Sequence, residues 1–170
     1  MSAEEVPVGG SARSTRSGSD QYLSFMLGAE EYGADIQRVQ EIKCWDTVTR
    51  VPYSPNYVLG VINLRGSIVP VIDLRIRFGL ERVPHDATTV IIVVQVPGER
   101  GHRTVGMVVD AVADVYYVDG DNIMPPPDAL GAVEKVFVKG LANQDGKLLI
   151  LLDIERLIMS SVCDETQAAA

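Results

Sequence analysis

Two loops in this sequence carry residues that could bind a phosphate or a metal ion. Residues 140–147 (GLANQDGK) resemble a phosphate-cradling loop, but five residues separate the glycines instead of four, and Leu148 replaces the magnesium-binding Ser or Thr. Residues 119–122 (DGDN) are acidic, yet they lack the ligand spacing and the closing Glu of an EF-hand. A hairpin turn is therefore the better interpretation of the first loop, and neither loop predicts a binding site.

Four other side chains are of types that often catalyse reactions. His85 and His102, the only histidines, fall in loops that we expect to be exposed, which supports neither a metal site nor a nucleophile relay. Asp73 and Asp153 end two similar segments, where capping of the next turn or helix is a better explanation than acid–base work. A small enzyme that uses this aspartate pair stays an alternative, but the sequence predicts no catalytic, cofactor-binding or metal-binding residues.

The composition limits the class of protein. A chain of 170 residues that is 46% hydrophobic is long enough for one domain or for two small lobes with a shared core. The net charge of −8 and the pI near 4.7 argue against nucleic-acid and anionic-membrane partners. No apolar stretch approaches the roughly 20 residues that cross a bilayer, and the acidic start does not resemble a secretory signal. Cys44 and Cys163 lack metal-type spacing, so we expect reduced thiols in a cytoplasmic protein.

The elements that position any functional residues centre on 58–75 (VLGVINLRGSIVPVIDLR). Two apolar runs flank Arg65, Gly66 and Ser67, which is typical of a hairpin. Gly66 accepts positive φ without steric cost and is expected to make the turn, with Arg65 at the tip. The second arm, 68–74, is apolar at nearly every position, so we expect both of its faces to be buried. Pro70 has no N–H, which predicts an edge or a bend.

The same pattern returns later in the chain. Residues 140–154 align with 60–74 without a gap, with glycine, asparagine, glycine and aspartate at matching positions. Further upstream, Gly33, Ile36, Val39 and Ile42 match Gly106, Val109, Val112 and Val115 at identical spacing. An internal duplication explains both alignments.

The remaining segments predict mostly short strands. Residues 36–42 carry apolar residues three apart and predict a short helix, with a second one toward residue 59. Residues 81–88 (ERVPHDAT) are polar and are the expected join between two halves, 21–80 and 88–159. We expect flexible or frayed tails at 1–20 and 160–170. Strands are predicted at 21–27, 32–36, 47–52, 89–96 and 104–118, followed by a hairpin over 134–152 and a closing helix over 153–159.

Three stretches together resemble the CheW family of bacterial chemotaxis coupling proteins. They are the hairpin 60–75 (GVINLRGSIVPVIDLR), 30–42 (EEYGADIQRVQEI) and 105–115 (VGMVVDAVADV). The resemblance covers about 21–158 and implies an all-β fold of two five-stranded, SH3-like barrels on a shared hydrophobic core with a few short helices. The barrels of this family can exchange strands, so the sequence halves need not be the spatial barrels. The loop 97–103 looks longer than usual for the family.

The resemblance also implies an adaptor without catalytic activity. Its implied partners are the regulatory domain of the histidine kinase CheA and the cytoplasmic tips of chemoreceptors, in arrays at the membrane. An adaptor of another chemosensory system with the same fold is an alternative. A less favoured one is an OB-like barrel that binds nucleic acid or oligosaccharide, against which stand the acidic charge and the lack of an aromatic platform.

A receptor helix could lie in an apolar seam between the two barrels. We expect the guanidinium of Arg65 to reach Glu41 and the pair to form a rim contact, because a charged turn residue has little reason to be buried. Each apolar member of the seam could equally be ordinary core. The expected receptor-binding residues are Ile36, Val39, Glu41, Leu64, Arg65, Gly66, Val112 and Val115.

Overall fold

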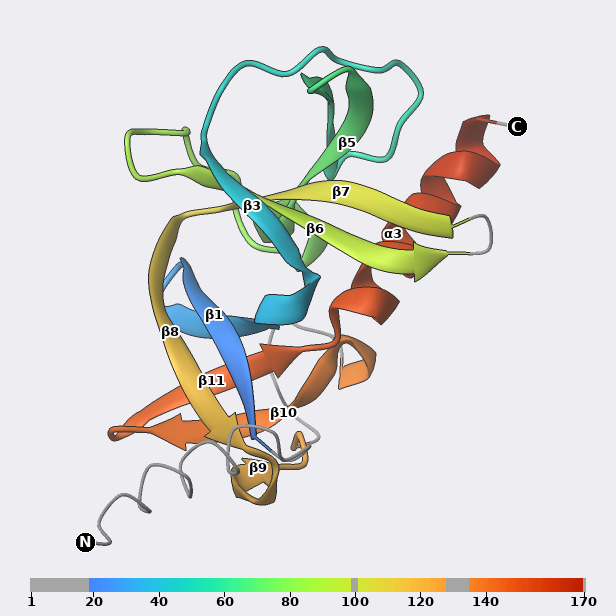
Figure 1. Ribbon diagram of the computed structural model, residues 1–170. Helices are drawn as coiled ribbons and strands as arrows, with labels where there is room; N and C mark the ends of the chain where they lie inside the picture. The colour runs from blue at the N-terminus through green and yellow to red at the C-terminus, as the bar shows by residue number, and fades with distance from the viewer. Residues whose placement is uncertain (1–18, 99–100, 128–134, 170) are drawn as a thin grey trace, which may run out of the picture.

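The computed structural model describes residues 19–98, 101–127 and 135–169, and the expected tail 1–20 lies outside these ranges except for its last two residues. Eleven described strands form two sheets, one of six and one of five strands. Each sheet corresponds to one barrel, and Figure 1 shows one barrel above the other. The predicted all-β fold of two barrels is confirmed, with one short extra strand. In spatial order the first barrel contains β8 (Ala111–Asp119), β1 (Ser19–Leu27), β2 (Glu30–Asp35), β11 (Lys147–Leu152), β10 (Val138–Gln144) and the two-residue β9 (Ile123–Met124).

The second barrel is a continuous part of the chain inserted into the first. It contains β3 (Val39–Cys44), β6 (Val90–Gly98), β7 (Gly101–Val109), β5 (Ser67–Asp73) and β4 (Val58–Leu64) in spatial order. The chain enters it after the 3₁₀ helix η1 (Ile36–Arg38) and leaves it where β7 passes into β8, the long strand on the left of Figure 1. The helices outside the barrels are α2 (Leu74–Arg77), η2 (Gly120–Asn122), η3 (Lys135–Phe137) and α3 (Ile154–Ala169).

The strand pairings repeat with the sequence alignment. Gly60 pairs with Val71 in the hairpin β4–β5, and Gly140 pairs with Leu151 in β10–β11, each next to a register shift. Val71 and Leu151 then pair in parallel with equivalent glycines, Gly106 of β7 and Gly33 of β2. The two hairpins therefore follow the same path, as the duplication predicts.

Each repeat is shared between the two barrels. The earlier strands β1 and β2 belong to the first barrel, whereas β3, β4 and β5 of the same repeat belong to the second. The later repeat does the reverse, since β6 and β7 lie in the second barrel and β8 to β11 in the first. The barrels in space are thus not the halves of the sequence.

A large apolar cluster joins the barrels. It includes the buried rings of Phe25 and Tyr32 from the first barrel and Ile92 and Met107 from the second. Leu157 of α3 is fully buried in the same cluster, and Figure 1 shows α3 running alongside both barrels. A single core therefore holds the two barrels and the last helix together.

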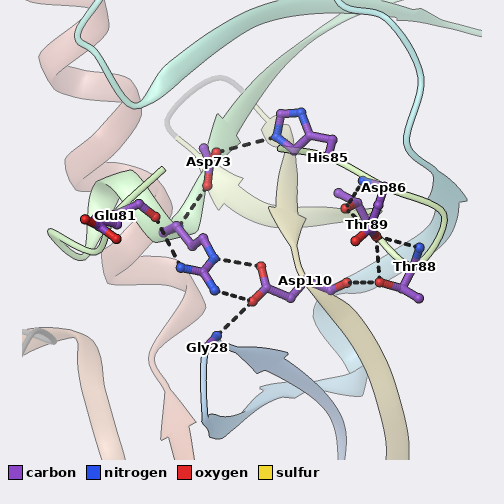
Figure 2. A network of polar contacts seen from close by, with 9 residues as sticks. Gly28, Asp73, Glu81, His85, Asp86, Thr88, Thr89 and Asp110 are labelled. Carbon is purple, nitrogen blue, oxygen red and sulfur yellow. Dashed lines mark hydrogen bonds and ion pairs between the residues drawn. The ribbon is translucent and has the colours of Figure 1, made fainter. Parts of the chain in front are cut away.

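Polar contacts also fix the junction, as Figure 2 shows. Asp110 lies between β7 and β8 and accepts hydrogen bonds from Arg75 Nε (2.9 Å) and Nη2 (2.7 Å). The same carboxylate accepts a bond of 2.8 Å from the backbone N–H of Gly28 in the first barrel, and Thr88 Oγ1 donates to the Asp110 carbonyl at 3.1 Å. Burial raises the pKa of Asp110, but the bonds from Arg75 and Gly28 outweigh it, so that the pKa of this carboxyl is lowered.

Three elements predicted from the sequence are wrong. Residues 36–42 form the single turn η1 and then the strand β3, because a register shift between Val39 and Glu41 gives the strand an apparent three-residue spacing. Residues 47–52 form no strand; only Thr49 makes an isolated bridge, with Val61. No helix forms between Ser54 and Leu59 either.

Two expectations on the arms and the last helix also need correction. Ile68 is 65% exposed, so the second arm of the first hairpin is buried on both faces only from Val71 onward. The helix α3 continues past residue 159, where we expected it to end, to Ala169. Ser161 is buried and its hydroxyl donates to the Leu157 carbonyl, and the Glu, Gln and Ala that follow favour the helical state.

Candidate functional site

Arg65 and Gly66 form the two-residue turn between β4 and β5. Their φ angles are +51° and +89°, and Asn63 Oδ1 accepts a bond of 2.9 Å from the Gly66 N–H. A hairpin turn with positive φ at both positions favours Asn, Asp or Gly, and another side chain there costs about 1 kcal/mol. The geometry of the turn thus gives no reason for an arginine at position 65.

The Arg65 guanidinium binds Glu41 through two contacts. Nη1 lies 2.8 Å from Glu41 Oε2, and Nη2 donates to Oε1 at 3.0 Å. The arginine side chain is 70% exposed and the glutamate 24%, so the pair is fixed but accessible. The predicted contact is confirmed, although Glu41 lies in β3 and not at the end of a helix.

The pair links the two edges of the second barrel. Glu41 lies on β3 at one edge of the sheet, and Arg65 directly follows β4 at the other. A two-contact guanidinium–carboxylate pair has defined geometry, which holds the β4–β5 turn near β3. The cation at this tip therefore has a fixed position relative to the barrel.

A hollow of about 500 Å³ opens next to Arg65. Ile68 and Pro70 line it on β5, and His102 and Arg103 line it on β7. The parallel pairing of β5 with β7 begins only at Val71, so the earlier residues of the two strands are apart, with Pro70 just before the pairing begins. Pro70 therefore lies where β5 separates from β7. It does not lie at a sheet edge, because β5 has β4 on its other side.

The eight predicted site residues do not form one continuous seam. Leu64, Arg65 and Gly66 are consecutive, and Arg65 binds Glu41. The side chain of Leu64 packs against the second barrel's own small core. The other four lie elsewhere: Ile36, Val39 and Val112 are half-buried against the shared core, and Val115 is 40% exposed on β8 of the first barrel.

Sequence reasoning missed several residues of the hollow, including Gln40, Ile68, Gln95 and Arg103. Ile68 had an available signal, because it is the second residue after the turn, where the first residues of a hairpin arm are least covered. The others come from β3, β6 and β7, and no local pattern shows that these strands meet.

Within residues 19–98, 101–127 and 135–169, no group of three or more His, Cys, Asp or Glu could hold a metal ion. Among the described helices, none is long and apolar enough to cross a membrane. Asp73 and Asp153 both cap the helices that follow them, by accepting from the backbone N–H groups of Arg75 and Arg156.

Comparisons with known proteins agree with this architecture. The chain is 44% identical over 140 residues to the chemotaxis protein CheW of Klebsiella aerogenes, with 82% of each chain covered. It is 36% identical to a probable chemotaxis protein CheW of Rhizobium etli, over 92% of this chain and 97% of the relative. The crystal structure of the scaffolding protein TtCheW from Thermoanaerobacter tengcongensis superposes with a TM-score of 0.74, at 35% identity, and covers 84% of this chain and 90% of that one.

The family model for the CheW-like domain matches residues 21–162, which is most of the chain. The CheW family consists of scaffold and adaptor proteins and not of enzymes, so the prediction of a protein without catalytic activity is confirmed. Two barrels, a duplicated hairpin and the matched model lead to one conclusion: this chain belongs to the CheW family of chemotaxis proteins.

Proposed function

We propose that this chain is the adaptor that couples chemoreceptors to the histidine kinase CheA, and that it is recruited from the cytoplasm to membrane-associated receptor arrays. The observation that carries the receptor contact is the Arg65–Glu41 pair, an exposed arginine in an unfavourable turn conformation and in a fixed position. A partner that binds the Arg65 guanidinium would explain why this turn has an arginine.

The receptor tip is proposed to contact Glu41, Leu64, Arg65 and Gly66 first. Ile36, Val39 and Val112 pack partly against the shared core and would contribute through their exposed fractions, while Val115 offers a second apolar contact on β8. An arginine beside apolar side chains is a frequent hot spot of protein interfaces.

Replacing Arg65 with alanine tests the proposal. An exposed pair contributes about 0–1 kcal/mol to stability, so Arg65→Ala should leave the melting temperature nearly unchanged. Loss of a hot spot worth about 2 kcal/mol should weaken binding of a receptor cytoplasmic fragment more than tenfold, whereas binding of the CheA regulatory domain should persist. Titrations against both fragments, with a thermal melt, measure the three quantities.

Arg156→Ala is the matched control, because Arg156 on α3 is 64% exposed and also forms a surface ion pair, with Asp153 at 3.6 Å. Equal losses of both partners in Arg65→Ala, or a large drop in melting temperature, would show that Arg65 is structural. The coupling itself is tested by adding the protein to CheA and receptor-bearing membranes, and unchanged kinase activity would contradict it.

A further inference from the structure

The hollow beside Arg65 lies where the inside of the second barrel changes from apolar to polar. Val93 of β6 is fully buried in the small core of this barrel. Gln95 lies two residues farther along the same strand, so its side chain points to the same face, and it lines the hollow. Its amide Nε2 donates to Thr104 Oγ1 of β7 at 3.3 Å, and Thr104 also lines the hollow. An amide and a hydroxyl group therefore stand where an apolar core would otherwise continue.

A proline accounts for the opening of this end of the barrel. In the first barrel, β11 already pairs with β2 at Leu149 and Ile150. Pro70 is the equivalent of Ile150 in the second barrel, and the pairing of β5 with β7 begins only after it, at Val71. Because proline has no N–H for a sheet hydrogen bond, the strands can separate here. The hollow thus occupies a place that paired strands fill in the other copy.

The hairpin β6–β7 is also longer than its own copy, β1–β2. The pair Leu27–Glu30 is followed directly by the turn of β1–β2, whereas the equivalent pair Val96–Arg103 is followed by two more pairs, which end at Gly98 and Gly101. The longer arm brings Arg103 and the preceding His102 to the hollow. This extension has no part in the two-barrel fold, since β1–β2 completes its barrel without it.

The charges around the hollow are the reverse of those in the first barrel. Arg103 occupies the position of Glu30, and Arg65 occupies that of Asp145. No residue that lines the hollow is acidic, and among the described residues Arg103 has no ion-pair partner. Arg65 is bound to Glu41, so Arg103 is the guanidinium that is available to a ligand. In a chain of net charge −8, this cation marks a local site for an anion.

We propose that the hollow binds a small hydroxylated metabolite that carries an oxyanion, either a phosphate or a carboxylate. Arg103 binds the oxyanion, and Gln95, Thr104 and Gln40 bind the hydroxyl groups. The volume of about 500 Å³ lies within the range of small-molecule sites, and the mouth of a barrel is a frequent place for them. The site goes beyond the adaptor function and requires neither of the proposed protein partners.

Calorimetric titration of the purified full chain tests the proposal with three probes. Ribose 5-phosphate and gluconate each combine hydroxyl groups with an oxyanion, whereas ribose has the hydroxyl groups alone. We expect at least one of the two anions to bind and ribose to bind more than tenfold more weakly. The anion that binds more tightly identifies the oxyanion as a phosphate or a carboxylate.

The replacement Arg103→Glu gives the second barrel the residue type of the first. Reversal of the charge should weaken binding of the anion more than tenfold, while the melting temperature should change little, because no described residue pairs with Arg103. Lys147→Glu is the matched control. Lys147 is exposed at the corresponding end of the first barrel, at the position of Ser67, and the same change of charge there should leave the affinity unaltered.

Four results would overturn the site. They are a wild-type protein that binds neither anion at millimolar concentration, equal affinity for ribose, full affinity in Arg103→Glu, and equal losses in Arg103→Glu and Lys147→Glu. The last of these would show that the anions respond only to the net charge of the chain.

Discussion

The two hairpins β4–β5 and β10–β11 have the same backbone and opposite charges at their tips. The turn residues Arg65 and Asp145 have φ of +51° and +54°, and the glycines that follow have +89° and +83°. In each turn an asparagine carboxamide oxygen accepts from the glycine N–H, at 2.9 Å in the first and 3.1 Å in the second. Aspartate suits this turn and arginine does not.

The two copies also differ in how the charge at the turn relates to the charge on the equivalent strands, β3 and β8. Glu41 of β3 corresponds in the repeat to Asp114 of β8. The first copy therefore combines Arg65 with a carboxylate, whereas the second has aspartate at both positions, 145 and 114. Since both hairpins fold alike, the fold does not require the arginine. The proposed receptor contact at Arg65 rests on this difference between the copies.

The largest effect on stability is expected at Gly60 and Gly140, the equivalent glycines at which the two aligned hairpin segments begin. A Cβ at Gly60 would lie 2.1 Å from the Thr49 carbonyl oxygen, with φ at +149°. At Gly140 it would lie 2.3 Å from a methyl group of Ile123, which is part of the two-residue β9. We expect Gly60→Ala to lower the free energy of unfolding by about 3 kcal/mol or more, and Gly140→Ala by about 1–2 kcal/mol.

Denaturant unfolding of the two variants measures the difference. Similar losses at both positions would show that crowding alone, and not the backbone angle, determines the effect.

The next prediction concerns the residues that follow each hairpin. Arg75 and Glu155 occupy equivalent positions in the two copies of the repeat. The Arg75–Asp110 pair is 16% and 28% exposed, whereas the Arg38–Glu155 pair is 35% and 50% exposed at 3.6 Å. Asp110→Ala leaves a largely buried guanidinium without its partner and should cost about 2 kcal/mol. Glu155→Ala should cost less than about 0.5 kcal/mol.

The same pair should make stability sensitive to acid. The pKa of Asp110 is lower in the folded than in the unfolded state, so its contribution is present above the ordinary aspartate range and is lost as pH falls through the folded value. The free energy of unfolding of the wild type should therefore exceed that of Asp110→Asn by less as the pH falls. Unfolding at a series of pH values measures this difference. A difference independent of pH would contradict this account.

The smallest effect on stability is expected at the tips themselves. Arg65→Asn relieves the turn and removes an exposed ion pair, so the free energy of unfolding should change by less than about 0.5 kcal/mol. Receptor binding should nevertheless fall as in Arg65→Ala. Asp145→Asn should change neither quantity, and an effect on receptor binding there would show that both copies take part.

The parts of the fold that depend on local patterns could be predicted from the sequence. The apolar arms around Arg65 and Gly66 specify a hairpin, and the matching glycines and asparagines specify its copy. The pair with Glu41 was expected only as a rim contact of the site that the resemblance implies. Local turn chemistry was sufficient for the two hairpins.

Other features depend on contacts between distant segments. The bulge between Val39 and Glu41 gives a strand the spacing of a helix, and a single sequence does not distinguish the two. Tyr53 has a positive φ directly after Pro52, and its residue type does not indicate this conformation, because such a turn favours Gly or Asn there. The hollow beside Tyr53 is lined by Arg50 and Arg82, and no local pattern shows that these two residues lie close together.

The insertion of one barrel into the other sets an order for folding. All strand pairs of the second barrel lie between Val39 and Val109, so it can close as soon as that part of the chain is available. The first barrel needs the pairing of Glu31 with Leu149, from near opposite ends of the chain. Closure of long loops slows folding, and the first barrel should therefore acquire protection from hydrogen exchange last during refolding. On the ribosome, all strands of the barrel that carries the Arg65–Glu41 pair can be paired while the other barrel still lacks its last strands.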